Sequence, residues 1–207
     1  MTALVDNLKN SANKVRAKVE ELELQMHLGK KESIDEFENQ KKNMKDYLHG
    51  AEDNLKNAKD ISADKMSSLK TKLEELKVQL ALGKAETAEK FDEQKSKLQH
   101  KLNDIESDIV DLKGKADDKT VEWASGLSET FDDFKTKMDV FRLNVALGSA
   151  DAKDEWKEKK EDMKQKLQAL KSKLNDTTIE GGEKLNDFNA EIAESFSHFK
   201  SAFKKIF

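Results

Sequence analysis

The chain has 207 residues with no proline and no cysteine, and 39% of its residues are charged while 36% are hydrophobic. The lack of cysteine excludes disulfides and thiol chemistry, and the low apolar content excludes a broad hydrophobic core. The formal net charge is −4, with acidic residues and lysines interleaved along the chain. A nucleic-acid-binding protein usually carries a basic stripe, so we expect no nucleic-acid partner.

Apolar residues recur at steps of three and four along three long segments, which is the spacing of one face of an α-helix. The pattern predicts helices near residues 3–57, 63–113 and 119–175, and a shorter helix near 183–206. The absence of proline permits helices of this length. Ser62 is the predicted N-cap of the second helix, and the run 117–120 marks the start of the third.

One short phrase occurs three times along the chain, centred on Gly29, Gly83 and Gly148. Eight residues after each glycine comes an aromatic residue, namely Phe37, Phe91 and Trp156. Self-similarity at fixed offsets indicates one structural unit used several times. We therefore predict an all-α fold: an elongated antiparallel bundle of three long helices. Residues 1–180 would form this three-repeat bundle or coiled coil, and residues 181–207 a C-terminal amphipathic helix.

The glycines are predicted to lie at mid-helix, where small residues let neighbouring backbones approach closely. Each glycine is followed four residues later by another small residue. By analogy with closely packed helix pairs in membranes, we expect helix crossings there. The predicted helix-crossing residues are Gly29, Gly83, Gly148, Ser33, Thr87 and Ala152. In this arrangement Gly83→Leu would push the helices apart and lower the melting temperature.

A second interpretation ends a helix at each glycine. Leu-Gly-Lys is a fair C-cap signal, and Ser33 with Glu36 would form a capping box. This interpretation gives six shorter helices joined in hairpins. The apolar spacing continues in phase across each glycine, so we favour the unbroken helices.

Side-chain patterns predict neither catalysis nor metal binding. The histidines form no i, i+4 pair and no His-Glu-x-x-His motif; they are His27, His49, His100 and His198. Catalytic carboxylates need a pocket that shifts their pKa values, whereas the acidic pairs here lie beside lysines on faces expected to be solvated. We therefore expect a protein that is not an enzyme, with no catalytic residue, cofactor, metal or small-molecule substrate.

Both tryptophans are interpreted as packing residues. Trp156 stands where the other two repeats have phenylalanine, which favours a place in the core. Trp123 lies near a predicted helix start, where we expect it to cover one end of the bundle.

The C-terminal segment is the strongest candidate for a functional surface. Its aromatic and aliphatic residues recur at steps of three and four, and lysines accompany them. A cationic helix with an aromatic face can lie in a membrane interface, although the same spacing is typical of an ordinary bundle helix. The predicted partner- or membrane-contacting residues are Phe188, Ile192, Phe196, Phe199, Phe203, Lys200, Lys204 and Lys205.

The leading functional prediction is a non-enzymatic structural or scaffolding coiled-coil protein that binds itself or another helical protein. Further apolar residues flank the main seam and are available to cover a fourth helix or a second protomer: Leu24, Leu28, Val78, Leu82 and Leu147. One alternative is a peripheral lipid-surface protein that binds through the C-terminal helix. Another is a stress- or desiccation-type protective protein, which the high charge favours and the regular aromatic residues oppose.

The expected location is the cytoplasm, peripheral to a membrane if the C-terminal helix binds lipid. No run of residues approaches the ~20 apolar residues of a membrane span. The first residues reach an acid at Asp6 and lack the apolar core of a signal peptide.

Overall fold

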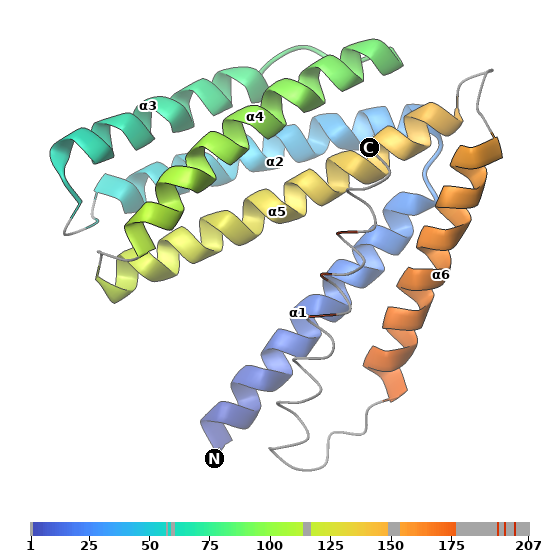
Figure 1. Ribbon diagram of the computed structural model, residues 1–207, viewed down its shortest axis with the longest axis horizontal. Helices are drawn as coiled ribbons and strands as arrows, with labels where there is room; N and C mark the ends of the chain where they lie inside the picture. Colours follow the sequence, from blue (N-terminus) through green and yellow to red (C-terminus); the bar gives the residue numbers. More distant parts are fainter. Residues whose placement is uncertain are drawn as a thin grey trace. The chain divides into compact units, whose positions relative to one another are not determined.

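The structure is a computed structural model that describes residues 2–56, 58, 61–113, 117–148 and 154–176, together with residues 194, 197 and 201. Within these ranges the chain forms six principal helices and no strand (Figure 1). They are α1 (Thr2–Met26), α2 (Lys30–Lys56), α3 (Ala63–Leu80), α4 (Ala88–Lys113), α5 (Asp118–Leu147) and α6 (Asp154–Asp176). The predicted all-α class is therefore confirmed.

The three long helices predicted from the repeat are wrong, because each is interrupted near its glycine. Gly29 lies in the short connection between α1 and α2, Gly83 lies between α3 and α4, and Gly148 directly follows α5. The interpretation with six shorter helices is the one observed. Apolar spacing that stays in phase across a glycine does not require one continuous helix, since each helix is selected separately for burial of its own apolar face.

Side-chain caps define the starts of three helices. In each case a side-chain oxygen accepts a hydrogen bond from the backbone N–H three residues later, at 3.4 Å for Ser62, 3.2 Å for Thr87 and 2.9 Å for Asp117. Such caps satisfy backbone donors that have no partner within the helix. The predicted N-cap at Ser62 and the predicted helix start at residues 117–120 are confirmed.

The contacts divide the chain into two compact units, which we call the terminal unit (Met1–Lys30 and Asp139–Phe207) and the central unit (Lys31–Met138). Within the terminal unit α1 packs against α6, and within the central unit α3 packs against α4. The boundary predicted at residue 181 lies outside the described residues.

The central unit has an apolar core to which α2, α3, α4 and the first part of α5 contribute. Phe37 of α2 and Phe91 of α4 meet at its centre with ring centroids 4.5 Å apart. Both were predicted from the repeat as core aromatic residues. Other completely or almost completely buried side chains are Leu48, Leu55, Leu69, Leu73, Leu76, Leu98, Leu102, Ile105, Ile109, Leu127 and Phe131. Packing of this kind is typical of a helical bundle.

The terminal unit buries a smaller set of apolar residues on α1, the end of α5 and α6. They are Val19, Leu22, Met26, Val140, Phe141, Leu143, Val145, Met163 and Leu167. The ammonium group of Lys171 on α6 lies 2.5 Å from the carboxylate of Glu23 on α1, which adds an ion pair beside this core. The side chain of Trp156 lies outside the described residues, so its predicted core position is untested.

Candidate functional site

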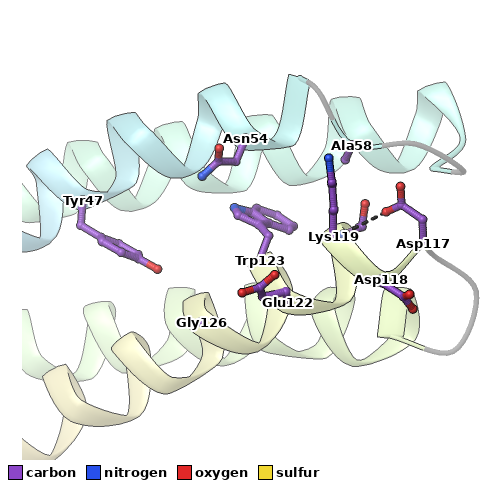
Figure 2. Close-up of a pocket in the computed structure, with 10 residues that line it drawn as sticks. Tyr47, Asn54, Ala58, Asp117, Asp118, Lys119, Glu122, Trp123 and Gly126 are labelled. Carbon is purple, nitrogen blue, oxygen red and sulfur yellow. Dashed lines mark hydrogen bonds between the residues drawn. The ribbon is translucent and has the colours of Figure 1, made fainter. Parts of the chain in front are cut away.

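A cleft of about 720 Å³ lies within the central unit, between the C-terminal half of α2 and the first turns of α5 (Figure 2). Tyr47 and Asn54 line it from α2, and Thr120, Trp123 and Gly126 line it from α5. Its volume is in the range of small-molecule binding sites, ~300–1,000 Å³. The cleft is therefore large enough to hold a small organic molecule.

Trp123 occupies the middle of this cleft. Figure 2 shows its indole reaching from α5 toward α2, with Tyr47 on one side and Lys119 on the other. The indole Nε1 atom is buried and has no hydrogen-bond partner in the described part of the chain. Buried polar groups in proteins are nearly always paired with protein or water, so an unpaired indole N–H is an unusual feature of this cleft.

Thr120 contributes a second unpaired polar group to the same cleft. Its residue is only 3% exposed, and its Oγ1 atom has no hydrogen-bond partner among the residues described. Its backbone N–H, in contrast, donates to the carboxylate of Asp117, which caps α5. Both unpaired atoms, one on each of two consecutive turns of α5, are fully buried, so neither is exposed to the space of the cleft.

The rim of the cleft is acidic. Asp117, Asp118 and Glu122 supply three carboxylates and Lys119 supplies one ammonium group, so the formal charge of these four residues is −2. Gly126 leaves the floor open, because a Cβ atom built there would meet only the Tyr47 hydroxyl, at 3.9 Å.

The cleft was not predicted from the sequence. Trp123 was expected to cover an end of the bundle, and its side chain lines the cleft between the start of α5 and the end of α2. The available signal was weak: an aromatic residue followed by glycine at i+3 leaves space beside the ring on one helix face. The second wall, from Tyr47 to Asn54, lies more than sixty residues away in the sequence, and only tertiary packing brings it there.

A second polar cluster surrounds the turn that follows α3. The buried ammonium group of Lys41 donates to the carbonyl oxygen of Leu82 at 2.9 Å and to Oε1 of Gln94 at 3.0 Å. It also lies 5.1 Å from the ring centroid of Phe37. Gln94 Nε2 donates in turn to the carbonyl oxygen of Gly83 at 2.6 Å. These contacts satisfy carbonyls beyond the end of α3, so we interpret the cluster as structural.

Lys41 belongs to a set of lysines that stand twelve residues after each repeat glycine; the others are Lys95 and Lys160. Lys95 is also buried, and half-buried Lys160 donates to Oδ1 of Asn144 at 2.9 Å. Burial lowers the pKa of Lys160, and the charge of Lys164 lowers it further. These lysines were not predicted from the sequence, although their recurrence twelve residues after each repeat glycine was a usable signal.

Four of the residues predicted to form helix crossings lie at or near helix ends. Gly83 is exposed in a turn, and a Cβ atom built on it would meet nothing within 4 Å. Thr87 caps α4, while Ser33 is buried inside α2 rather than at its start. Gly148 shows a close approach, with Lys30 Cβ 2.4 Å from a Cβ built there.

Several other predicted site residues cannot be placed. Ala152 and the predicted partner- or membrane-contacting residues lie outside the described residues: Phe188, Ile192, Phe196, Phe199, Phe203, Lys200, Lys204 and Lys205. Among the helices that the structure describes, none has the length and hydrophobicity needed to cross a membrane. In the same residues no cluster of three or more histidine or acidic side chains is arranged to hold a metal ion.

Comparisons with known proteins found no family model, no curated protein and no solved structure that matches this chain. A function for the chain therefore has to be inferred from its own residues and their geometry.

Proposed function

We propose that this chain is a non-enzymatic helical scaffold protein that acts through self-association, using apolar side chains left exposed on its helices. The main supporting observation concerns the position five residues before the glycine of each repeat. Leu24 and Val78 occupy it in the first two repeats and are 71% and 62% exposed, whereas Leu143 occupies it in the third repeat and is buried.

Exposed aliphatic residues scattered over a surface need no explanation, but these two recur at equivalent positions. Val78 is also followed four residues later by Leu82, which is exposed as well. Val78 lies in the last turn of α3 and Leu82 in the turn that follows this helix, so two exposed apolar side chains lie at the C-terminal end of α3, and we call this pair the ridge. Burying such side chains contributes ~1.5–3 kcal/mol each, which favours weak, concentration-dependent association.

The carboxylates of the described residues support the non-enzymatic part of this proposal. Those whose pKa is displaced from its ordinary value have a lowered pKa, and hydrogen bonding to a lysine is the largest cause in each: Asp35, Asp53, Glu74, Glu93 and Asp154. A general acid requires the opposite displacement, produced by burial. Ion pairing on helix surfaces accounts for these lowered values.

Sedimentation equilibrium over a hundredfold range of protein concentration tests the proposal. We expect the weight-average mass to rise with concentration, and we expect Val78→Lys/Leu82→Lys to abolish the rise by introducing charge at the ridge. Val110→Lys is the matched control, since Val110 is 63% exposed on α4 but lies outside this ridge. A wild-type chain that stays monomeric throughout, or a control that dissociates equally, would contradict self-association.

A further inference from the structure

We propose that Lys160 on α6 is a modification site, at which the lysine amine accepts an acyl group from a small acyl phosphate. The inference goes beyond self-association, because Lys160 lies in the terminal unit and the Val78–Leu82 ridge lies in the central unit. It combines three features of this lysine: a half-buried side chain, a neutral hydrogen-bond partner on α5, and a second lysine one turn along α6.

The hydrogen bond of Lys160 is to an amide that is itself held in place. Lys160 Nζ donates to Oδ1 of Asn144 at 2.9 Å, and Asn144 Nδ2 donates to the backbone carbonyl oxygen of Gln25 at 2.8 Å. Asn144 is only 2% exposed. An amide oxygen only accepts hydrogen bonds, so it holds one N–H of the amine and leaves the lone pair of the neutral amine available for nucleophilic attack.

The neighbouring lysines of α6 have a different environment. Lys157 pairs with the carboxylate of Asp154 at 2.9 Å, and Lys166 pairs with that of Asp162 at 2.6 Å. An adjacent carboxylate favours the charged ammonium form, which is not nucleophilic. Within the part of the chain that the structure describes, Lys160 forms no ion pair with a carboxylate.

Burial and a neighbouring positive charge both favour the neutral amine of Lys160. Burial is the larger cause that lowers the pKa of Lys160, and the charge of Lys164 is the second. Desolvation and an adjacent cation are the two arrangements that activate lysine nucleophiles in proteins. Lys164 also supplies a positive charge beside the amine, which attracts the phosphate group of an acyl phosphate.

Access separates Lys160 from the equivalent lysines of the other two repeats. Lys41 and Lys95 are 1% and 7% exposed, and Lys41 also pairs with the carboxylate of Glu38 at 2.8 Å. Lys160 is half-buried, so part of its side chain is open to a small reagent. The modification site is therefore assigned to the third repeat.

The reaction needs no group beyond the amine and the acyl donor. Neutral Nζ of Lys160 attacks the carbonyl carbon of the acyl phosphate, and the new C–N bond replaces the C–O bond to the phosphate. Phosphate leaves with the bonding electron pair, and the surplus proton of the amine passes to water. The product is an uncharged amide, so α6 loses one positive charge.

Limited acetylation of the full-length protein by acetyl phosphate at pH 8 tests the proposal. The amines left unreacted are then labelled completely with isotopically heavy acetic anhydride under denaturing conditions. Peptide mass spectrometry gives the extent of the first reaction at each lysine. We expect Lys160 to react at least about fivefold faster than Lys157, because Lys160 is partly desolvated and adjacent to a cation.

Two variants of equal net charge separate the local effect of Lys164 from a general effect of charge. Lys164→Gln should slow the acetylation of Lys160 at least about twofold, since it removes the neighbouring cation, whereas Lys166→Gln should leave the rate unchanged. Asn144→Asp places a carboxylate against the amine, so in a folded protein Lys160 should react no faster than Lys157.

Three results would each overturn the proposal. The first is a Lys160 that reacts no faster than Lys157 in the wild-type protein. The second is a Lys160 rate that Lys164→Gln leaves unchanged or that Lys166→Gln lowers equally. The third is undiminished reactivity of Lys160 in a folded Asn144→Asp protein; if that variant does not fold, the two lysine variants still decide.

Discussion

Lys77 on α3 is a buried cation held between two carboxylates. Its ammonium group lies 2.7 Å from Glu52 on α2 and 2.9 Å from Glu74 on its own helix, and Glu52 is buried as well. Burial by itself lowers the pKa of Lys77, but the hydrogen bonds to Glu52 and Glu74 outweigh it, so the pKa is raised. The ion pair therefore stabilises the contact between α2 and α3 while lysine is charged.

We expect Lys77→Met to lower the free energy of unfolding by about 3 kcal/mol at pH 8, because it leaves the Glu52 carboxylate buried without its partner. Urea denaturation followed by circular dichroism measures this loss. The pKa of Lys77 is raised above its ordinary value of 10.5, so its contribution is fully present below that pH. The difference between wild type and variant should then shrink as the pH rises through the folded-state pKa.

The double variant Lys77→Met/Glu52→Leu is the control for this prediction. Replacing both charges with apolar groups removes the stranded carboxylate, so most of the lost stability should return. A single variant as stable as wild type, or a double variant no more stable than the single one, would contradict a stabilising role for the ion pair of Lys77 with Glu52.

At the scale of the secondary-structure elements, Gly83 and Gly148 differ in whether their surroundings leave space for a side chain. A Cβ atom at Gly83 would lie in open space, whereas at Gly148 it would come within 2.4 Å of Lys30 Cβ. We expect Gly83→Ala to change stability by no more than ~0.5 kcal/mol, as for other open surface sites. Gly148→Ala should cost ~1–3 kcal/mol, since the clash is with a Cβ atom that cannot move independently of its backbone.

Thermal melts of Gly83→Ala, Gly148→Ala and the wild-type protein measure these changes in stability. This expectation replaces the one drawn from unbroken helices, in which substitution at Gly83 would lower the melting temperature sharply. A large destabilisation by Gly83→Ala together with no effect of Gly148→Ala would contradict the assignment of open space to Gly83 and of a close contact to Gly148.

The helix faces were predictable from the sequence, whereas the helix ends were only partly so. Phe37 and Phe91 are buried as the repeat predicts, and Ser62 caps α3 through a local hydrogen bond. At Gly83 the same glycine signal fitted either a packed crossing or a turn. The choice between them depends on distant contacts, including the hydrogen bond from Lys41 to the carbonyl oxygen of Leu82, which local patterns do not encode.

For the whole molecule, we expect residues 31–138 to fold independently. Their four helix segments bury a common core and are joined by their own ion pairs, such as those of Lys72 with Asp108 and Lys135 with Glu106. A segment that supplies its own core can fold as a domain. The isolated segment should show a helical circular dichroism spectrum and a single cooperative thermal transition.

Phe91→Ala within the isolated segment provides the control. It removes one ring of the Phe37–Phe91 contact and should cost ~3–5 kcal/mol, as large-to-small core substitutions do. A broad, non-cooperative melt of the unsubstituted segment, or a melt insensitive to Phe91→Ala, would contradict an independent central core.

By itself, the sequence determined the all-α class, buried helix positions such as Phe37 and Phe91, and two helix starts, because helical periodicity and capping depend on residues within a few positions of one another. Tertiary structure alone decided that the repeat glycines end helices, that Lys41 is buried beneath the turn after α3, and that Trp123 faces α2 across a cleft. Each of these features joins segments far apart in the sequence, and burial and hydrogen-bond pairing between such segments arise only when the helices pack together.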